Sequence, residues 1–319
     1  MRSEELVLAS GAGWLRGICS PAMALSLDDT RRAYAEEIRA VADIRCEALI
    51  EALARVPRED FLGPGPWLVW RFSLPPSLRR DTSPASNYRL TRDADPRQLC
   101  HNILIAIDPE RGLNNGAPAA NLWWLDSLDL RAGDRVVHVG CGLGYYTAII
   151  AEAVGPTGSV LAIECDEGLA ARSRANLRTW PQVNVVTGDG ATFDLGEFDV
   201  GYINAGATRL MPRWLAGLRP GGRLLVPLTV DAPDAGGYTL LVTRTGERWS
   251  ARFTGMVAIY SCYGARDATS GDALRELYKQ PIVRDVQSLR RDPHEREATC
   301  AMHLDDYCLS TLPPDPLSL

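Results

Sequence analysis

The sequence has a single lysine, four histidines, no C-x-x-C pair and no long apolar run, and each scarcity excludes a class of protein. No stretch reaches the roughly 18 unbroken apolar residues of a membrane helix, so we expect no membrane span. The cysteines are scattered through a chain large enough to need no disulfides, which is typical of reduced thiols in the cytoplasm. The nearest metal-ligand cluster is Cys300, His303 and Cys308 in the tail, and we expect no metal site.

The charge of the chain argues against a nucleic-acid partner. The net charge is −6, the positive residues are almost all arginines, and the few runs of arginine are short. Neutralising a phosphate backbone requires clustered cations, which this pattern does not supply. The oligomeric state has no signature in the sequence.

The order of apolar segments predicts an α/β fold. Short apolar runs alternate with amphipathic stretches from residue 122 onward, which is typical of a Rossmann-like, doubly wound, mostly parallel sheet. We expect strands at 136–139, 160–163, 183–186, 198–203 and 223–227, and helices at 146–153, 167–177, 212–218 and 272–279. Residues 238–243 and 249–253 predict an antiparallel edge hairpin.

These patterns divide the chain into four parts. Residues 1–27 are interpreted as a leader, with Met23 as an alternative start. Residues 28–121 hold an N-terminal helix that ends at Val56-Pro57 and an irregular substrate-side segment. Residues 122–263 form the cofactor-binding core, and 264–319 a C-terminal extension.

A glycine-rich turn follows the first strand of the core. Residues 140–144 read G-C-G-L-G and enter a helix, so the backbone can approach a ligand at the helix N-terminus. Glu164 ends the second strand, where a carboxylate can accept both ribose hydroxyls of an adenosine-containing cofactor. A dinucleotide fingerprint would place its third glycine at Tyr145, so the G-x-G-x-G form favours S-adenosyl-L-methionine over nicotinamide.

Two further strand ends complete the expected cofactor site. An Asp in the turn 188–190 can accept from an adenine amino group, and Asn204 ends the fourth strand beside the expected methyl position. Downstream of it the chain reads N-A-G-A rather than the Pro-Pro-aromatic motif of enzymes that methylate flipped bases. The predicted cofactor-binding residues are Gly140, Cys141, Gly142, Gly144, Tyr145, Glu164, Asp189, Gly190 and Asn204.

From about Tyr34 to Pro227 the chain resembles the protein-L-isoaspartate O-methyltransferase family. The similarity lies in V-P-R-E-D-F at 56–61, G-C-G-L-G-Y-Y-T-A at 140–148, G-D-G at 188–190 and P-G-G-R-L-L-V-P at 220–227. The resemblance implies a methyltransferase that uses S-adenosylmethionine to esterify a carboxyl group of a peptide or protein.

The sequence departs from the family pattern at the substrate side. Gly116 stands where the family keeps a serine, and His138 stands where many members carry Glu. We expect Asn114, Asn115 and Pro118 to form a substrate lip, and the sequence identifies no catalytic residue. His138 is interpreted as a buried strand residue rather than a base. A small-molecule or modified-peptide substrate and a non-catalytic cofactor-binding homologue stay open as alternatives.

Overall fold

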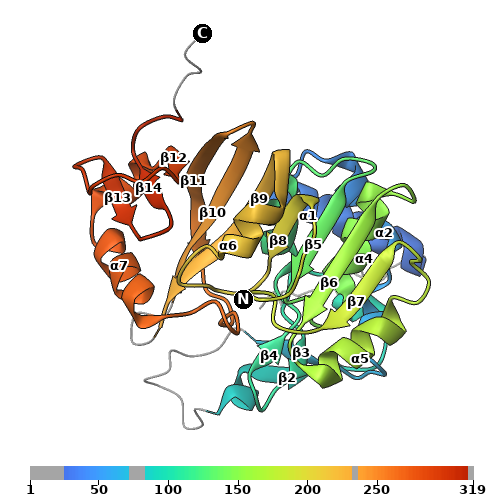
Figure 1. The fold of residues 1–319 in the computed structure, drawn as a ribbon. Helices are drawn as coiled ribbons and strands as arrows, with labels where there is room; N and C mark the ends of the chain where they lie inside the picture. Colours follow the sequence, from blue (N-terminus) through green and yellow to red (C-terminus); the bar gives the residue numbers. More distant parts are fainter. Residues whose placement is uncertain (1–24, 72–82, 232–235, 315–319) are drawn as a thin grey trace, which may run out of the picture.

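The computed structural model describes residues 25–71, 83–231 and 236–314, so the expected leader lies almost entirely outside the described residues. Among them, the largest element is a ten-stranded sheet with the order β13-β14-β12-β11-β10-β9-β8-β5-β6-β7 (Figure 1). The strands are β5 (Arg135–Val139), β6 (Ser159–Glu164), β7 (Val183–Thr187), β8 (Phe198–Ile203), β9 (Leu218–Val230), β10 (Gly236–Thr245), β11 (Arg248–Val257), β12 (Ser288–Arg290), β13 (Cys300–His303) and β14 (Cys308–Ser310).

The parallel half of this sheet confirms the predicted doubly wound fold. Strands β7, β6, β5, β8 and β9 pair in parallel, and the chain order reverses direction beside β5. Ligands of open α/β sheets bind at this switch point, outside the carboxyl ends of the strands. The topology therefore points to the loops that follow β5, β6 and β8.

Helices cover both faces of the sheet, as the alternating pattern predicts. One buried cluster joins the N-terminal helices to the strands, and a second lies on the opposite face under the C-terminal helices. The helices are α1 (Leu27–Ala42), α2 (Glu47–Arg55), α3 (Pro118–Ser127), α4 (Tyr145–Val154), α5 (Glu167–Asn176), α6 (Pro212–Gly217) and α7 (Ala268–Tyr278).

The single N-terminal helix expected from the sequence is two helices. Asp43 adopts a left-handed conformation with φ 49° and ends α1, and α2 starts again at Glu47. Asp126 holds this corner because its carboxylate accepts hydrogen bonds from the backbone N–H groups of Arg45 and Cys46. The spacing of the apolar residues resumes nearly in register after this break. The sequence pattern therefore predicted one continuous helix. The end of α2 at Arg55 agrees with the predicted stop before Pro57.

The irregular segment before the core contains only short elements. Its strands form two small antiparallel pairs beside the large sheet. They are β1 (Leu68–Trp70), β2 (Tyr88–Leu90), β3 (Ala106–Asp108) and β4 (Leu113–Asn114), with single helical turns at Arg58–Phe61, Pro84–Asn87 and Pro96–Leu99.

The predicted edge hairpin is not at the edge of the sheet. β10 and β11 pair as expected, but the tail adds β12, β14 and β13 beyond them. These strands were missed because each is only three or four residues long, too short for an alternating pattern to register. None of the helices in the described part of the chain has the length and apolar character needed to cross a membrane.

Candidate active site

A cavity of 790 Å³ lies at the carboxyl ends of β5, β6 and β8, at the switch point of the sheet. It has two ends of different chemistry. The loop end is formed by Gly140, Cys141, Gly142, Glu164, Cys165 and Asp166. The amide end is formed by Asn114, Asn115, Gly116, Asn121, Asn204 and Tyr260.

The loop end contains two glycines at positions where the backbone conformation disfavours any other residue. Gly140 and Gly142 have positive φ angles of 76° and 56°. A Cβ on Gly140 would lie 3.1 Å from the Asn204 carbonyl oxygen, so the turn closes tightly against the end of β8. A Cβ on Gly142 would have only Ile107 near it, at 4.0 Å. The glycine therefore leaves open a cradle that a ligand can fill.

Glu164 is the anchoring carboxylate of the loop end. Its side chain is buried and accepts hydrogen bonds from the N–H groups of Gly142, at 2.8 Å, and Asp166, at 3.1 Å. A carboxylate has about four lone-pair sites, so acceptor capacity remains for a ligand's hydroxyl groups. The same bonds fix the glycine turn relative to β6. This arrangement suits the ribose of S-adenosylmethionine, and these residues would hold that cofactor.

Three predicted residues lie apart from the cavity lining. Gly144 is needed for helix packing instead, since its Cβ would lie 2.7 Å from a Leu177 methyl. The Asp189 carboxylate accepts from the N–H of Ala191 and abuts Gly264. Pro118 is buried at the start of α3. The other predicted residues, namely Gly140, Cys141, Gly142, Tyr145, Glu164, Gly190, Asn204, Asn114, Asn115 and Gly116, all line the cavity.

Cys141 has no sign of reactivity. Burial raises the pKa of its thiol to about 12, and its nearest polar neighbour is the Ser173 hydroxyl at 3.7 Å. The thiol therefore stays protonated, and Cys141 lines the loop end of the cavity with a small, unreactive side chain.

Arg58 organises the amide end from outside the cavity. The side chain is buried, and its guanidinium donates to the carbonyl oxygens of Leu99, His101, Ile103 and Gly116. It also donates to Asn115 Oδ1 at 3.1 Å. The N–H of Ile105 donates to the same oxygen, so the amide of Asn115 is fixed in orientation. Its Nδ2 is buried without a hydrogen-bond partner among the described residues, so this donor is unsatisfied.

Gly116 occupies a position that a serine would enter only with rearrangement. Its φ is 73°, and an added Cβ would lie 2.6 Å from Nδ2 of Asn121. That amide is itself held in place, because Nδ2 donates to the Ala117 carbonyl and Oδ1 accepts from the Tyr202 hydroxyl. The side chain of Asn121 thus fills the space beside Gly116.

Tyr202 connects Asn121 to the end of β8 and also explains His138. Its hydroxyl is 2.8 Å from Asn121 Oδ1 and 3.2 Å from Asn204 Oδ1. The ring of His138 stacks on Tyr202, and its Nδ1 lies 2.9 Å from the Thr147 hydroxyl. Burial lowers the pKa of His138 to about 3, so the ring is neutral and supports the tyrosine. The structure agrees with the interpretation of His138 as a buried strand residue.

Tyr260, from the segment after β11, lines the cavity at the amide end. Asn114 Nδ2 donates to the Tyr260 hydroxyl at 2.6 Å, and that hydroxyl donates to the Gly112 carbonyl. The predicted substrate lip is therefore tied to a segment that lies far along the chain.

Sequence analysis missed Asn121, Tyr202 and Tyr260. Asn121 carried a usable signal, since it is an isolated polar residue in the apolar stretch of α3. Tyr202 and Tyr260 had none, because their roles depend on the sheet order and on the chain's return over the cavity.

Comparison with known proteins finds relatives of one kind. A family model described as protein-L-isoaspartate(D-aspartate) O-methyltransferase matches residues 111–241. A protein-L-isoaspartate O-methyltransferase of Methanothrix thermoacetophila is 29% identical over 228 residues, which cover 70% of this chain and 92% of the relative. A second such enzyme, from Archaeoglobus fulgidus, is 40% identical over 105 residues, covering 32% of this chain and 48% of the relative.

Solved structures show the same fold. A protein-L-isoaspartate O-methyltransferase superposes with a TM-score of 0.57 at 19% identity, over 78% of this chain and 69% of that one. A Plasmodium falciparum structure described as a putative enzyme of the same kind, in complex with S-adenosyl-L-homocysteine, gives 0.54 at 16% identity, over 73% and 97%. The chain is therefore similar in sequence to protein-L-isoaspartate O-methyltransferases and shares the fold of these S-adenosylmethionine-dependent methyltransferases.

Proposed function

We propose that this protein transfers a methyl group to a side-chain carboxylate of a peptide or protein, with isoaspartate as the first candidate. The observation that carries this proposal is the chemistry of the amide end. Among the described residues that line the cavity, the only carboxylates are Glu164 and Asp166 of the loop end, and there is no histidine. An amine or alcohol acceptor needs a base to remove its proton, whereas a carboxylate is already an anionic nucleophile.

The residues of the amide end suit an anionic oxygen. The buried amide N–H of Asn115 has no partner among the described residues and would be satisfied by an acceptor oxygen, whereas the Tyr260 hydroxyl is already bonded to Gly112 and Asn114. Bound S-adenosylmethionine supplies an electrophilic methyl on a sulfonium with a good leaving group. The chain's residues then have to orient the acceptor in line and exclude water, which positioning alone can do.

We further propose that Gly140, Gly142, Glu164 and Gly190 hold the cofactor and that Asn114 and Asn115 contact the acceptor. The cavity supports this division because both sets of residues line it, and the turn after β5 lies close to Asn204 after β8. The unpaired cysteines of the described residues support a reducing compartment such as the cytoplasm as the place of action.

The test is methyl transfer from labelled S-adenosylmethionine to an isoaspartyl peptide, measured as base-labile labelled methanol. The matched control is the same peptide with aspartate, and the buffer control contains no peptide. We expect ester formation on the isoaspartyl peptide above both controls. Binding of S-adenosylhomocysteine without ester formation on any carboxylate would refute the proposed acceptor.

A second candidate is a small molecule or a modified peptide. The side chain of Asn121 fills the space beside Gly116, where the family pattern has a serine, and Tyr260 is bonded to Asn114 at the same end. The same labelled donor with a panel of carboxylate-bearing small molecules and constrained peptides separates the two candidates. Faster transfer to a constrained or small acceptor than to the linear isoaspartyl peptide would favour the second.

A further inference from the structure

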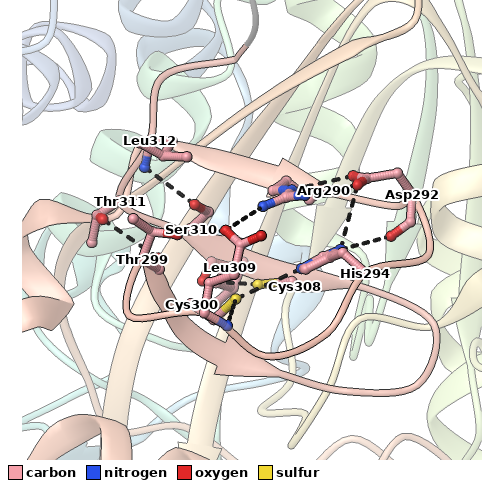
Figure 2. Close-up of polar contacts among 11 residues, drawn as sticks. Arg290, Asp292, His294, Thr299, Cys300, Cys308, Leu309, Ser310, Thr311 and Leu312 are labelled. Atoms are coloured by element: carbon pink, nitrogen blue, oxygen red, sulfur yellow. Dashed lines mark hydrogen bonds and ion pairs between the residues drawn. The ribbon is translucent and has the colours of Figure 1, made fainter.

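Four potential metal ligands converge in the C-terminal extension, far from the candidate active site in the sequence. The ligand atoms of His294, Cys300, His303 and Cys308 all lie within 4.8 Å of one another. Figure 2 shows the His294 ring pointing toward the sulfur atoms of Cys300 and Cys308. This set has two nitrogens and two sulfurs, which is a common donor set for structural zinc.

The fold explains why the sequence pattern predicted no metal. Cys300 and His303 begin and end β13, and the antiparallel register places His303 opposite Cys308 of β14. His294 comes from the preceding loop. The guanidinium of Arg290 holds that loop through Asp292, at 2.8 Å, and Glu297, at 3.3 Å. The ligands thus come from a hairpin and a folded loop, an arrangement that motif spacing does not reveal.

The separation of two of the ligand atoms suits one tetrahedral ion. Zinc–ligand bonds of about 2.0 to 2.3 Å imply ligand atoms about 3.3 to 3.8 Å apart around a tetrahedral centre. Nε2 of His294 lies 3.6 Å from the Cys300 sulfur. The two thiols are at most 5% exposed, counted over the whole residue, so solvent has little access to the centre.

The surrounding groups orient the ligands for an ion at the centre. Nδ1 of His294 lies 2.8 Å from the Asp292 carbonyl oxygen, so it donates there and leaves Nε2 free of a proton. The N–H of Glu297 donates to the Cys300 sulfur at 3.3 Å, as suits a thiolate. Nδ1 of His303 is buried without a hydrogen-bond partner in the described part of the chain. A buried nitrogen of this kind calls for a ligand.

We propose that His294, Cys300, His303 and Cys308 bind one zinc ion. Two thiols give up their protons to solvent on binding, and the ion receives four bonds from the protein. Because four protein ligands leave no open position, the site is structural rather than catalytic. The ion joins the 291–299 loop to the β13–β14 hairpin, and its binding energy becomes folding energy of this extension.

A metal ion at this position would stabilise a part of the chain that has few backbone hydrogen bonds to the large sheet. β12 pairs with β11 only at Ser288 and Ser250, so the ladder gives the extension little hold on the sheet. Its β13–β14 turn nevertheless supports the loop after β8, where Asn204 lies. Asp306 forms an ion pair with Arg209 at 2.6 Å, and the Tyr307 hydroxyl accepts from the N–H of Leu210 at 3.1 Å. The zinc-bound hairpin therefore braces the loop that follows Asn204.

The proposal is tested on the full chain, purified without a histidine tag or chelator, by metal analysis and thiol titration. We expect about one zinc per chain in the native protein. The variants Cys300→Ser and Cys308→Ser should lose it. Cys46→Ser, which changes a partly buried thiol outside the cluster, should keep it.

A second measurement does not depend on the variants folding. Replacement of the native metal by Co²⁺ should give thiolate-to-metal charge-transfer absorption and the visible bands of a tetrahedral centre. Folded native protein that contains no zinc and gives no such bands with Co²⁺ would overturn the proposal. So would a Cys300–Cys308 disulfide found by mass spectrometry after thiol trapping, or zinc retained undiminished in both cysteine variants.

Discussion

The two ends of the cavity are built in different ways. The loop end comes from two adjacent segments, the turn after β5 and residues 164–166 at the end of β6. The amide end draws on Asn114 and Asn115, on Asn121 of α3, on Asn204 after β8 and on Tyr260 beyond β11. The proposed cofactor end is thus a local motif, whereas the proposed acceptor end depends on tertiary structure. On this proposal, variation of the substrate need not disturb cofactor binding.

The largest effect is expected from Arg58→Met, which removes the hydrogen bonds that hold the amide end and leaves the loop end unchanged. Methionine fills the aliphatic space but leaves buried carbonyl oxygens without a donor, which costs about 1–3 kcal/mol for each unsatisfied group. We expect the free energy of unfolding to fall by about 3 kcal/mol or more, measured by urea denaturation. Arg55→Met, on the exposed end of α2, should change it by less than about 1 kcal/mol. Equal losses in the two variants would contradict the role of Arg58.

Glu164→Ala tests the loop end. The change removes an acceptor for the ribose hydroxyls and releases the N–H of Gly142, and each charge-assisted hydrogen bond contributes about 1.5–3 kcal/mol. We expect the affinity for S-adenosylhomocysteine, measured by calorimetry, to fall about 100-fold. The matched control is Glu167→Ala at the exposed start of α5, where affinity should be unchanged. Unchanged binding in Glu164→Ala would refute the assignment.

Gly116→Ser introduces the side chain that the family pattern has at this position. The residue has φ 73°, and its Cβ would meet Asn121, so we expect a loss of about 2 kcal/mol in the free energy of unfolding. Gly246→Ser, in the β10–β11 turn with φ 62° and open space around its Cβ, separates the backbone cost from the contact. A loss no greater than that of Gly246→Ser would show that Asn121 gives way freely.

The smallest effect is expected from Asn115→Asp, which sharpens the division between the ends. Oδ1 can still accept from Arg58 and Ile105, but the free donor Nδ2 becomes a carboxylate oxygen. Repulsion of a substrate carboxylate should raise KM for the peptide about tenfold, or about 1.4 kcal/mol, with S-adenosylhomocysteine affinity unchanged. Asn102→Asp, outside the cavity lining, should leave both constants unchanged. A loss of cofactor affinity in Asn115→Asp would mean that the two ends are not separate.

Sequence reasoning identified cavity-lining residues where the lining comes from neighbouring segments. The glycines at 140 and 142 and Glu164 were identifiable because a turn after one strand and the end of the next meet in every parallel pair. It failed where contacts join distant segments, as for Tyr202 with Asn121, or Tyr260 with Asn114. Asp189 shows a third case, because the motif is present but its carboxylate is engaged by Ala191 and Gly264 instead of facing the cavity.

The central claim is that one cavity holds the cofactor at its loop end and the methyl acceptor at its amide end. A crystal structure of the protein with S-adenosylhomocysteine tests this most directly. We predict electron density for the ribose beside Glu164, with the sulfur directed toward Asn204 and Asn115. Density elsewhere on the molecule, or a ligand oriented with its sulfur away from the amide end, would contradict the account.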